Sequence, residues 1–139
     1  MSALSDYLEN ALLQRIFNGV AFVNPATYVA LFTGDPTDAG NGPEVSGNAY
    51  ARVQVNPSSG ASPKWNAAVV DGAGYLVDNH DAITFPQASG SWGTITHFGI
   101  FDAATSGNLL MYGPLSASKT VGANDTFLFA AGDLNLRLE

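Results

Sequence analysis

Over most of this chain, apolar and polar residues alternate with the period of a β-strand. Residues 27–33 (TYVALFT) form a continuous apolar run, rich in aromatic and β-branched types, between turn-forming residues, which is typical of an inner strand. Residues 49–55 alternate as a half-buried strand does, and residues 95–101 form the clearest later strand. Shorter strands are predicted at residues 65–70, 75–77, 82–85, 109–112, 126–130 and 134–138.

Only the segment before Gly19 has a helical period. Its apolar stripe consists of Leu4, Leu8, Leu12 and Ile16, spaced by four, with Leu13 and Phe17 widening it. Asp6 and Glu9 would lie in the first turn, and Asn18 precedes the glycine that ends the helix. Because this stripe is wide for so short a helix, we expect it to be buried against the domain or against a neighbouring copy.

About eight or nine short strands and one helix predict an all-β fold. We expect an antiparallel β-sandwich or jelly-roll-like domain with one short N-terminal α-helix. A chain of 139 residues is long enough for one core, so residues 1–139 are predicted to form a single domain, with the helix in residues 1–19 and the sandwich in residues 26–139. No long helices alternate with the strands, which disfavours a parallel α/β sheet.

The charge of the chain is low and acidic. Charged residues make up 12% of it, about half of the usual share, and the net charge is −7. The five basic residues are scattered singly, so neither nucleic acid nor an anionic membrane is an expected partner. A weakly charged surface indicates that copies cover one another, and we predict a homo-oligomer, most simply a trimer.

The sequence contains no cysteine, which excludes disulfides and thiolate chemistry. It has no apolar run of membrane-spanning length, and its first residues lack the basic region of a secretory signal. We therefore expect a soluble product made in the cytoplasm.

Two histidines are candidates for chemistry. His80 is flanked by Asp78 and Asp81, a pattern that suits a metal ligand or a general base but is equally ordinary in a β-turn, which we favour. His97 lies in the predicted strand 95–101, and a hydrogen-bonded, partly buried histidine is the preferred interpretation.

The loop from Asp35 to Glu44 is rich in oxygen ligands, with Asp38 and Asn41 between its ends. Ala39 and Ser46 fall where an EF-hand needs ligands, so that motif fails. A looser cation site stays open, although a solvated loop is favoured. With no P-loop, no G-x-S-x-G elbow and no suitable pair of glutamates, we predict no catalytic, cofactor or metal residues and no enzymatic activity.

The aromatic residues allow a different hypothesis. A glycan-stacking platform could be built from Tyr50, Trp65, Tyr75, Trp92 and Tyr112. Trp92, in a Gly-Ser-Trp-Gly loop, is predicted to be an exposed contact, with interface packing and sugar binding both open. The candidate assembly contacts are Leu4, Leu8, Leu12, Ile16 and Trp92.

Short motifs along nearly the whole chain resemble a family of small virion structural proteins of tailed bacteriophages, often labelled tail fibre proteins. They are residues 5–10 (SDYLEN), 28–33 (YVALFT), 35–40 (DPTDAG), 44–47 (EVSG), 50–52 (YAR), 91–94 (SWGT), 99–103 (GIFDA), 118–120 (SKT) and 125–127 (DTF). The resemblance implies a virion protein, made in the host cytoplasm, without a catalytic motif.

The place on the particle is a separate question. A fibre normally has a repetitive or coiled shaft, which this sequence lacks. Capsid decoration (cement) on the major capsid protein is therefore the first expectation. A tail fibre, fibre adaptor or baseplate protein, bound to other tail proteins and with a glycan or receptor-binding role, is the alternative.

Overall fold

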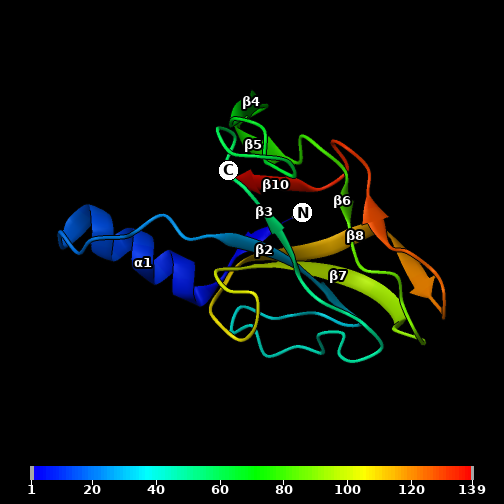
Figure 1. Cartoon of the computed structure of the whole chain (residues 1–139). Coiled ribbons are helices and arrows are strands. Elements are labelled where there is room, and N and C mark those ends of the chain that lie inside the picture. Colours follow the sequence, from blue (N-terminus) through cyan, green and yellow to red (C-terminus); the bar gives the residue numbers. More distant parts are fainter. Residues whose placement is uncertain (1, 139) are drawn as a thin grey trace.

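The computed structural model describes residues 2–138 and consists mainly of strands (Figure 1). Its one helix among these residues is α1 (Asp6–Phe17). The strands are β1 (Ala3–Leu4), β2 (Thr27–Phe32), β3 (Val53–Val55), β4 (Val69–Asp71), β5 (Gly74–Asp78), β6 (Ile83–Thr84), β7 (Gly93–Phe101), β8 (Leu109–Val121), β9 (Leu128–Phe129) and β10 (Asn135–Leu138).

A five-stranded antiparallel sheet in the order β1-β8-β7-β2-β3 forms the centre of the fold. β7 and β2 pair from Tyr28 opposite Phe101 to Phe32 opposite His97. The last four residues of β2 are buried, as are the last four of β7. Their nearly continuous apolar sequences therefore correspond to strands that are covered on both faces.

Two smaller sheets cover one face of this central sheet: β10-β5-β4 and β6-β9. The main core lies between the layers and combines side chains from both, including Leu31 and Ile95 of the central sheet with Ile83 and Phe129 of the two-stranded sheet. Burial of these apolar side chains is the main favourable contribution to the fold.

The opposite face of the central sheet is covered by the long loop between β2 and β3, which runs below the sheet in Figure 1. A second apolar cluster of Ala30, Phe32, Phe101 and Leu109 lies on this face. Gly99 lies among them, and a Cβ atom there would be 2.9 Å from Phe32 Cε2. The two phenylalanine rings stack with their centroids 6.2 Å apart, so the packing requires glycine at this position.

The predicted β-rich antiparallel fold with one N-terminal helix is confirmed, and the layers pack as a sandwich does. The jelly-roll form is not confirmed, because the second layer is split into a three-stranded and a two-stranded sheet. β8 is much longer than the predicted strand 109–112. Beyond Tyr112 it no longer pairs with β1 and becomes an edge strand, where Pro114 is tolerated.

The N-terminus departs from the prediction at Leu4. Leu4 lies in β1 and pairs with Met111 of β8, whereas the apolar pattern placed it in the helix. Ser5 has extended backbone angles and accepts a hydrogen bond from the Leu8 amide at 3.2 Å, which makes it the N-cap of α1. Its capping side chain explains why the helix begins at Asp6.

Candidate interaction surfaces

The helix α1 and the segment that returns to β2 form an arm that projects from the body of the molecule (Figure 1). We define the arm as residues 6–26. Its helix has no buried residue, and its contacts with the sheets are mainly with β8. The accessible surface of the chain, 7297 Å², exceeds by roughly 450 Å² the value of about 6,800 Å² expected for a compact monomer of this mass.

Ser5 fixes the arm to the central sheet. Its buried hydroxyl donates a short hydrogen bond to the carbonyl of Leu109 while accepting one from the Leu8 amide. Its own amide donates to the carbonyl of Leu110 at 2.9 Å. Because one hydroxyl caps the first turn of the helix and also hydrogen-bonds to a carbonyl of β8, Ser5 sets the direction in which the arm leaves the sheet.

The outer face of the arm is apolar. Three side chains at helical spacing, Leu13, Ile16 and Phe17, are exposed, as is Val20 beyond the end of the helix, and Ile16 and Phe17 retain 68% and 75% of their accessible surface. Of the two predicted ways to bury the helix, the structure excludes burial of Ile16 against its own domain and leaves a neighbouring copy open, while Leu4, Leu8 and Leu12 are half-buried. Their assignment as assembly contacts stays a prediction.

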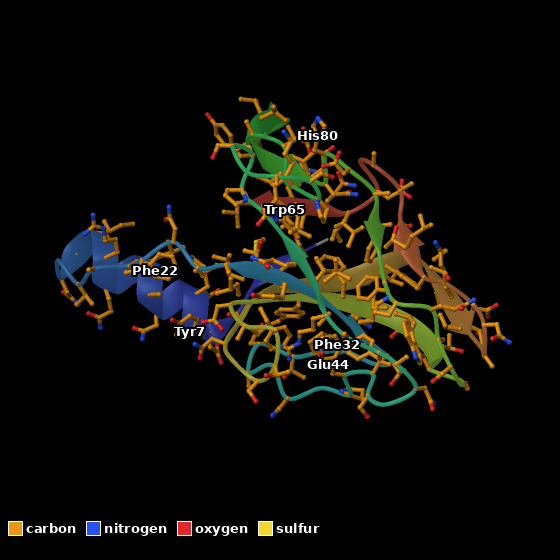
Figure 2. The ribbon with its side chains drawn as sticks, viewed as in Figure 1. Tyr7, Phe22, Phe32, Glu44, Trp65 and His80 are labelled. Atoms are coloured by element: carbon orange, nitrogen blue, oxygen red, sulfur yellow. The ribbon has the colours of Figure 1, made fainter. Side chains whose placement is uncertain are left out.

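An apolar groove of about 400 Å³ lies at the base of the arm, between the central sheet and the three-stranded sheet. Among its walls are Leu8 of α1, Trp65, Met111 of β8 and Leu136 of β10; Trp65 is labelled in Figure 2. Among residues 2–138, no Asp, Glu, Lys or Arg lines the groove. Its rim includes the small exposed side chains of Ala67 and Ala68, so the opening is wide enough for apolar side chains to enter.

Trp92 is buried, with 5% of its surface accessible, which corrects the prediction of an exposed contact. Its indole Nε1 donates to the carbonyl of Asn48 at 3.0 Å, and its ring lies edge-on to Tyr50 with centroids 5.4 Å apart. Trp92 therefore fixes the loop that contains Asn48 to the core, and its indole N–H is satisfied inside the protein.

The five aromatic residues of the suggested glycan platform do not form one exposed surface. Trp65 and Trp92 are buried, Tyr50 and Tyr112 are half-buried, and Tyr75 alone among these five is exposed. The Trp65 indole donates to Thr27 Oγ1 at 2.9 Å, so its edge is directed at the base of β2. These contacts assign Trp92 to the core and hold Trp65 in place in the wall of the groove.

The oxygen-rich loop is engaged with its own chain. Asp35 accepts a hydrogen bond from the Thr37 amide at 2.8 Å, and Asp38 accepts a short one from the Tyr112 hydroxyl. This bond is the main cause that raises the pKa of Tyr112 to about 12. Within residues 2–138, no group of three His, Cys, Asp or Glu side chains is placed to hold a metal ion.

Glu44, at the end of that loop, belongs to a network that the sequence analysis did not foresee. Its carboxylate accepts from the Tyr50 hydroxyl at 2.9 Å and pairs with Arg52, with Nη2 and Oε2 2.7 Å apart. The Tyr50 hydroxyl accepts from the Leu31 amide at 3.0 Å. Burial, reinforced by the charge of Glu44, raises the pKa of Tyr50, which stays protonated. The spacing of these residues gives no local signal for the network.

The histidines lie apart from both surfaces. His80 is exposed in a turn, and its Nδ1 lies 3.0 Å from Asp81 Oδ1; this hydrogen bond is the main cause that lowers the pKa of Asp81. His97 is partly buried on β7, with its Nδ1 2.8 Å from Thr96 Oγ1. The prediction of a partly buried, hydrogen-bonded His97 is confirmed.

A second hollow of about 390 Å³ lies between β8 and β10. Phe127 and Phe129 form part of its floor, and two basic and two acidic residues line it: Lys119, Arg137, Asp71 and Asp133. Arg137 Nη2 donates to the carbonyl of Asp71 at 2.9 Å. The described residues that line the hollow therefore carry no net charge.

The comparison with protein families decides the class of this protein. Residues 3–137 match the family described as podophage GP4 fiber I protein gp80. The chain belongs to this phage fibre family. No curated protein matches it. This match confirms the resemblance of the short motifs to a family of small phage virion proteins. No helix within residues 2–138 is both long and apolar enough to cross a membrane.

Proposed function

We propose that this protein is a non-enzymatic structural component of a tailed-phage virion, located in the tail as a fibre protein. The family match over residues 3–137 carries this proposal. It favours the tail over capsid decoration, which was the first expectation from the sequence. The partners on this account are other virion proteins of the tail and further copies of the same chain.

The geometry supports a structural role. The carboxylates of Glu44 and Asp38 are hydrogen-bonded within the chain, whereas the outer face of the arm and the groove are apolar surfaces that stay uncovered. Uncovered apolar surfaces of this kind are typical of protein–protein contacts. The role therefore depends on binding other proteins, and the missing shaft of a fibre would be supplied by those partners.

Deletion of the gene, with complementation from a plasmid, tests this proposal. We expect particles without the protein to have intact, DNA-filled heads but reduced adsorption to the host, and the complemented phage to recover. A decoration protein predicts the reverse: adsorption would be unchanged and the heads would burst more readily on heating. Heat-sensitive heads with normal adsorption would overturn the tail assignment.

A further inference from the structure

The arm and the groove are apolar surfaces of the same chain that do not cover each other. Leu8, near the start of α1, lines the groove, while Ile16 and Phe17 lie at the far end of the helix. From Leu8 to Phe17 the helix rises about 14 Å at 1.5 Å per residue. Because Ser5 fixes the helix so that it points away from the body, its distal end does not reach its own groove (Figure 1).

The chemistry of the two surfaces is complementary. The outer face of the arm presents branched and aromatic side chains, and none of the described residues that line the groove is charged. A volume of about 400 Å³ accommodates a few side chains rather than a whole helix. The two exposed side chains at the helix end, Ile16 and Phe17, are of that size.

Charge points to a second copy as the occupant. The segment 10–26 contains one charged residue, Arg15, so it carries +1, and since the whole chain carries −7 the rest of the chain carries −8. The whole arm, which also contains Asp6 and Glu9, carries −1, but its distal segment 10–26 brings an apolar and weakly positive surface to an acidic body when it enters the groove of another copy. Contact between two bodies would bring like charges together.

We propose that the distal end of the arm, through Ile16 and Phe17, docks in the groove of a second copy of this chain, against Trp65 and Met111 of that copy. This inference rests on the proposed function only in that a fibre component is present in several copies. Each contact joins two different surfaces. Two copies can therefore form a closed dimer by exchanging arms, and three copies can form a closed ring.

Sedimentation velocity tests the arm side of the contact. The double variant Ile16→Asp and Phe17→Asp alters exposed residues and should fold, as circular dichroism can verify. We expect its self-association constant to fall by tenfold or more, about 1.4 kcal/mol per factor of ten. Leu128→Asp is the control, because Leu128 is 41% exposed on β9 and neither lines the groove nor pairs with a strand that does. A monomeric wild type, or equal association of variant and control, would overturn the proposal.

Cross-linking tests which surface receives the arm. The chain has no cysteine, so Asn18→Cys beside Phe17 and Ala68→Cys at the groove rim each provide a single thiol. Mixing the two proteins with a short bis-maleimide should give a dimer that contains one chain of each. Asn18→Cys mixed with Ala73→Cys, in the turn between β4 and β5, is the control and should give little product.

Two results of the cross-linking would contradict the docking. One is equal product with Ala68→Cys and Ala73→Cys. The other is cross-linking within a single chain that carries both Asn18→Cys and Ala68→Cys, which would mean that the arm folds back on itself. Either result would leave the proposed location in the tail unaffected, since the location is tested separately on particles that lack the protein. Reduced adsorption of those particles would in turn not support the docking.

Discussion

Arg52 and Glu44 form a two-bonded ion pair on the loop-covered side of the central sheet, with Nε to Oε1 at 2.8 Å and Nη2 to Oε2 at 2.7 Å. The Arg52 guanidinium also lies 3.7 Å from the ring centroid of Phe101. Its Nη1 donates to the carbonyls of Ala103 and Ser106. One guanidinium thus connects the loop between β2 and β3 with the turn between β7 and β8.

Removal of Arg52 should destabilise the protein. Arg52→Ala leaves the Glu44 carboxylate partly buried without its cation and frees two backbone carbonyls. We expect the free energy of unfolding to fall by about 2 to 4 kcal/mol in urea denaturation. Arg15→Ala, on the exposed arm, should change it by less than about 0.5 kcal/mol. Equal effects of the two substitutions would contradict the role given to the pair.

A methyl group at Gly99 should disturb the packing of the second cluster. The added Cβ would lie 2.9 Å from Phe32 Cε2 and 3.0 Å from Leu109 Cδ1, both in buried side chains. We expect Gly99→Ala to lower the free energy of unfolding by about 1 to 3 kcal/mol. Gly122→Ala meets only Asp125 Oδ2 at 3.5 Å and serves as the control. A Gly99→Ala protein as stable as that control would show that the cluster can relax.

Ser5→Ala should loosen the arm more than it weakens the core. The substitution removes the N-cap and the hydrogen bond to the Leu109 carbonyl, at about 1 to 2 kcal/mol. Amide hydrogen exchange should accelerate in α1 and stay nearly unchanged in β7. The exposed Ser116→Ala on β8 provides the control. Faster exchange spread evenly over both elements would contradict the anchoring role.

The Tyr112–Asp38 hydrogen bond should give an alkaline dependence of stability. An unfolded tyrosine ionises near pH 10, whereas the bond keeps Tyr112 protonated up to a pKa of about 12. Between these values the unfolded chain binds fewer protons at this residue, so its contribution to stability is lost as the pH rises from 10 to 12. Tyr112→Phe should therefore show a smaller decrease in stability than the wild type over this range. Parallel curves would contradict the prediction.

Asp38→Asn provides a second check on the same bond. Asparagine replaces the charged acceptor with a neutral amide, which weakens the hydrogen bond that is the main cause of the shift and removes the charge, so the pKa of Tyr112 should move toward 10. Ultraviolet absorbance titration of the phenol, with Tyr112→Phe subtracted, measures this directly. An unchanged pKa would assign the shift to another cause.

The sequence predicted those strands whose burial follows from the apolar composition of the strand itself. β2 and the last four residues of β7 are apolar on both faces, so their composition indicates burial directly. β8 was underestimated, because its outer part is held by pairing with β7 and not by its own Ser-rich sequence. Such pairing depends on residues far away in the chain, which periodicity does not record.

The candidate contacts show the same limit. The helical period of α1 was visible, but which side faces the body depends on how Ser5 joins the helix to β8. The burial of Trp92 depends on Asn48, more than forty residues away. The pair of Glu44 and Arg52 likewise forms only when the loop closes over the sheet. None of these long-range contacts has a sequence pattern of its own.

A cryo-electron microscopy reconstruction of the purified virion most directly tests the central claim that this chain is a fibre protein of the tail. The account predicts density for its β-sandwich and projecting arm on the tail, in far fewer copies than the major capsid protein. Density for this domain on the capsid lattice, or its absence from the particle, would contradict it.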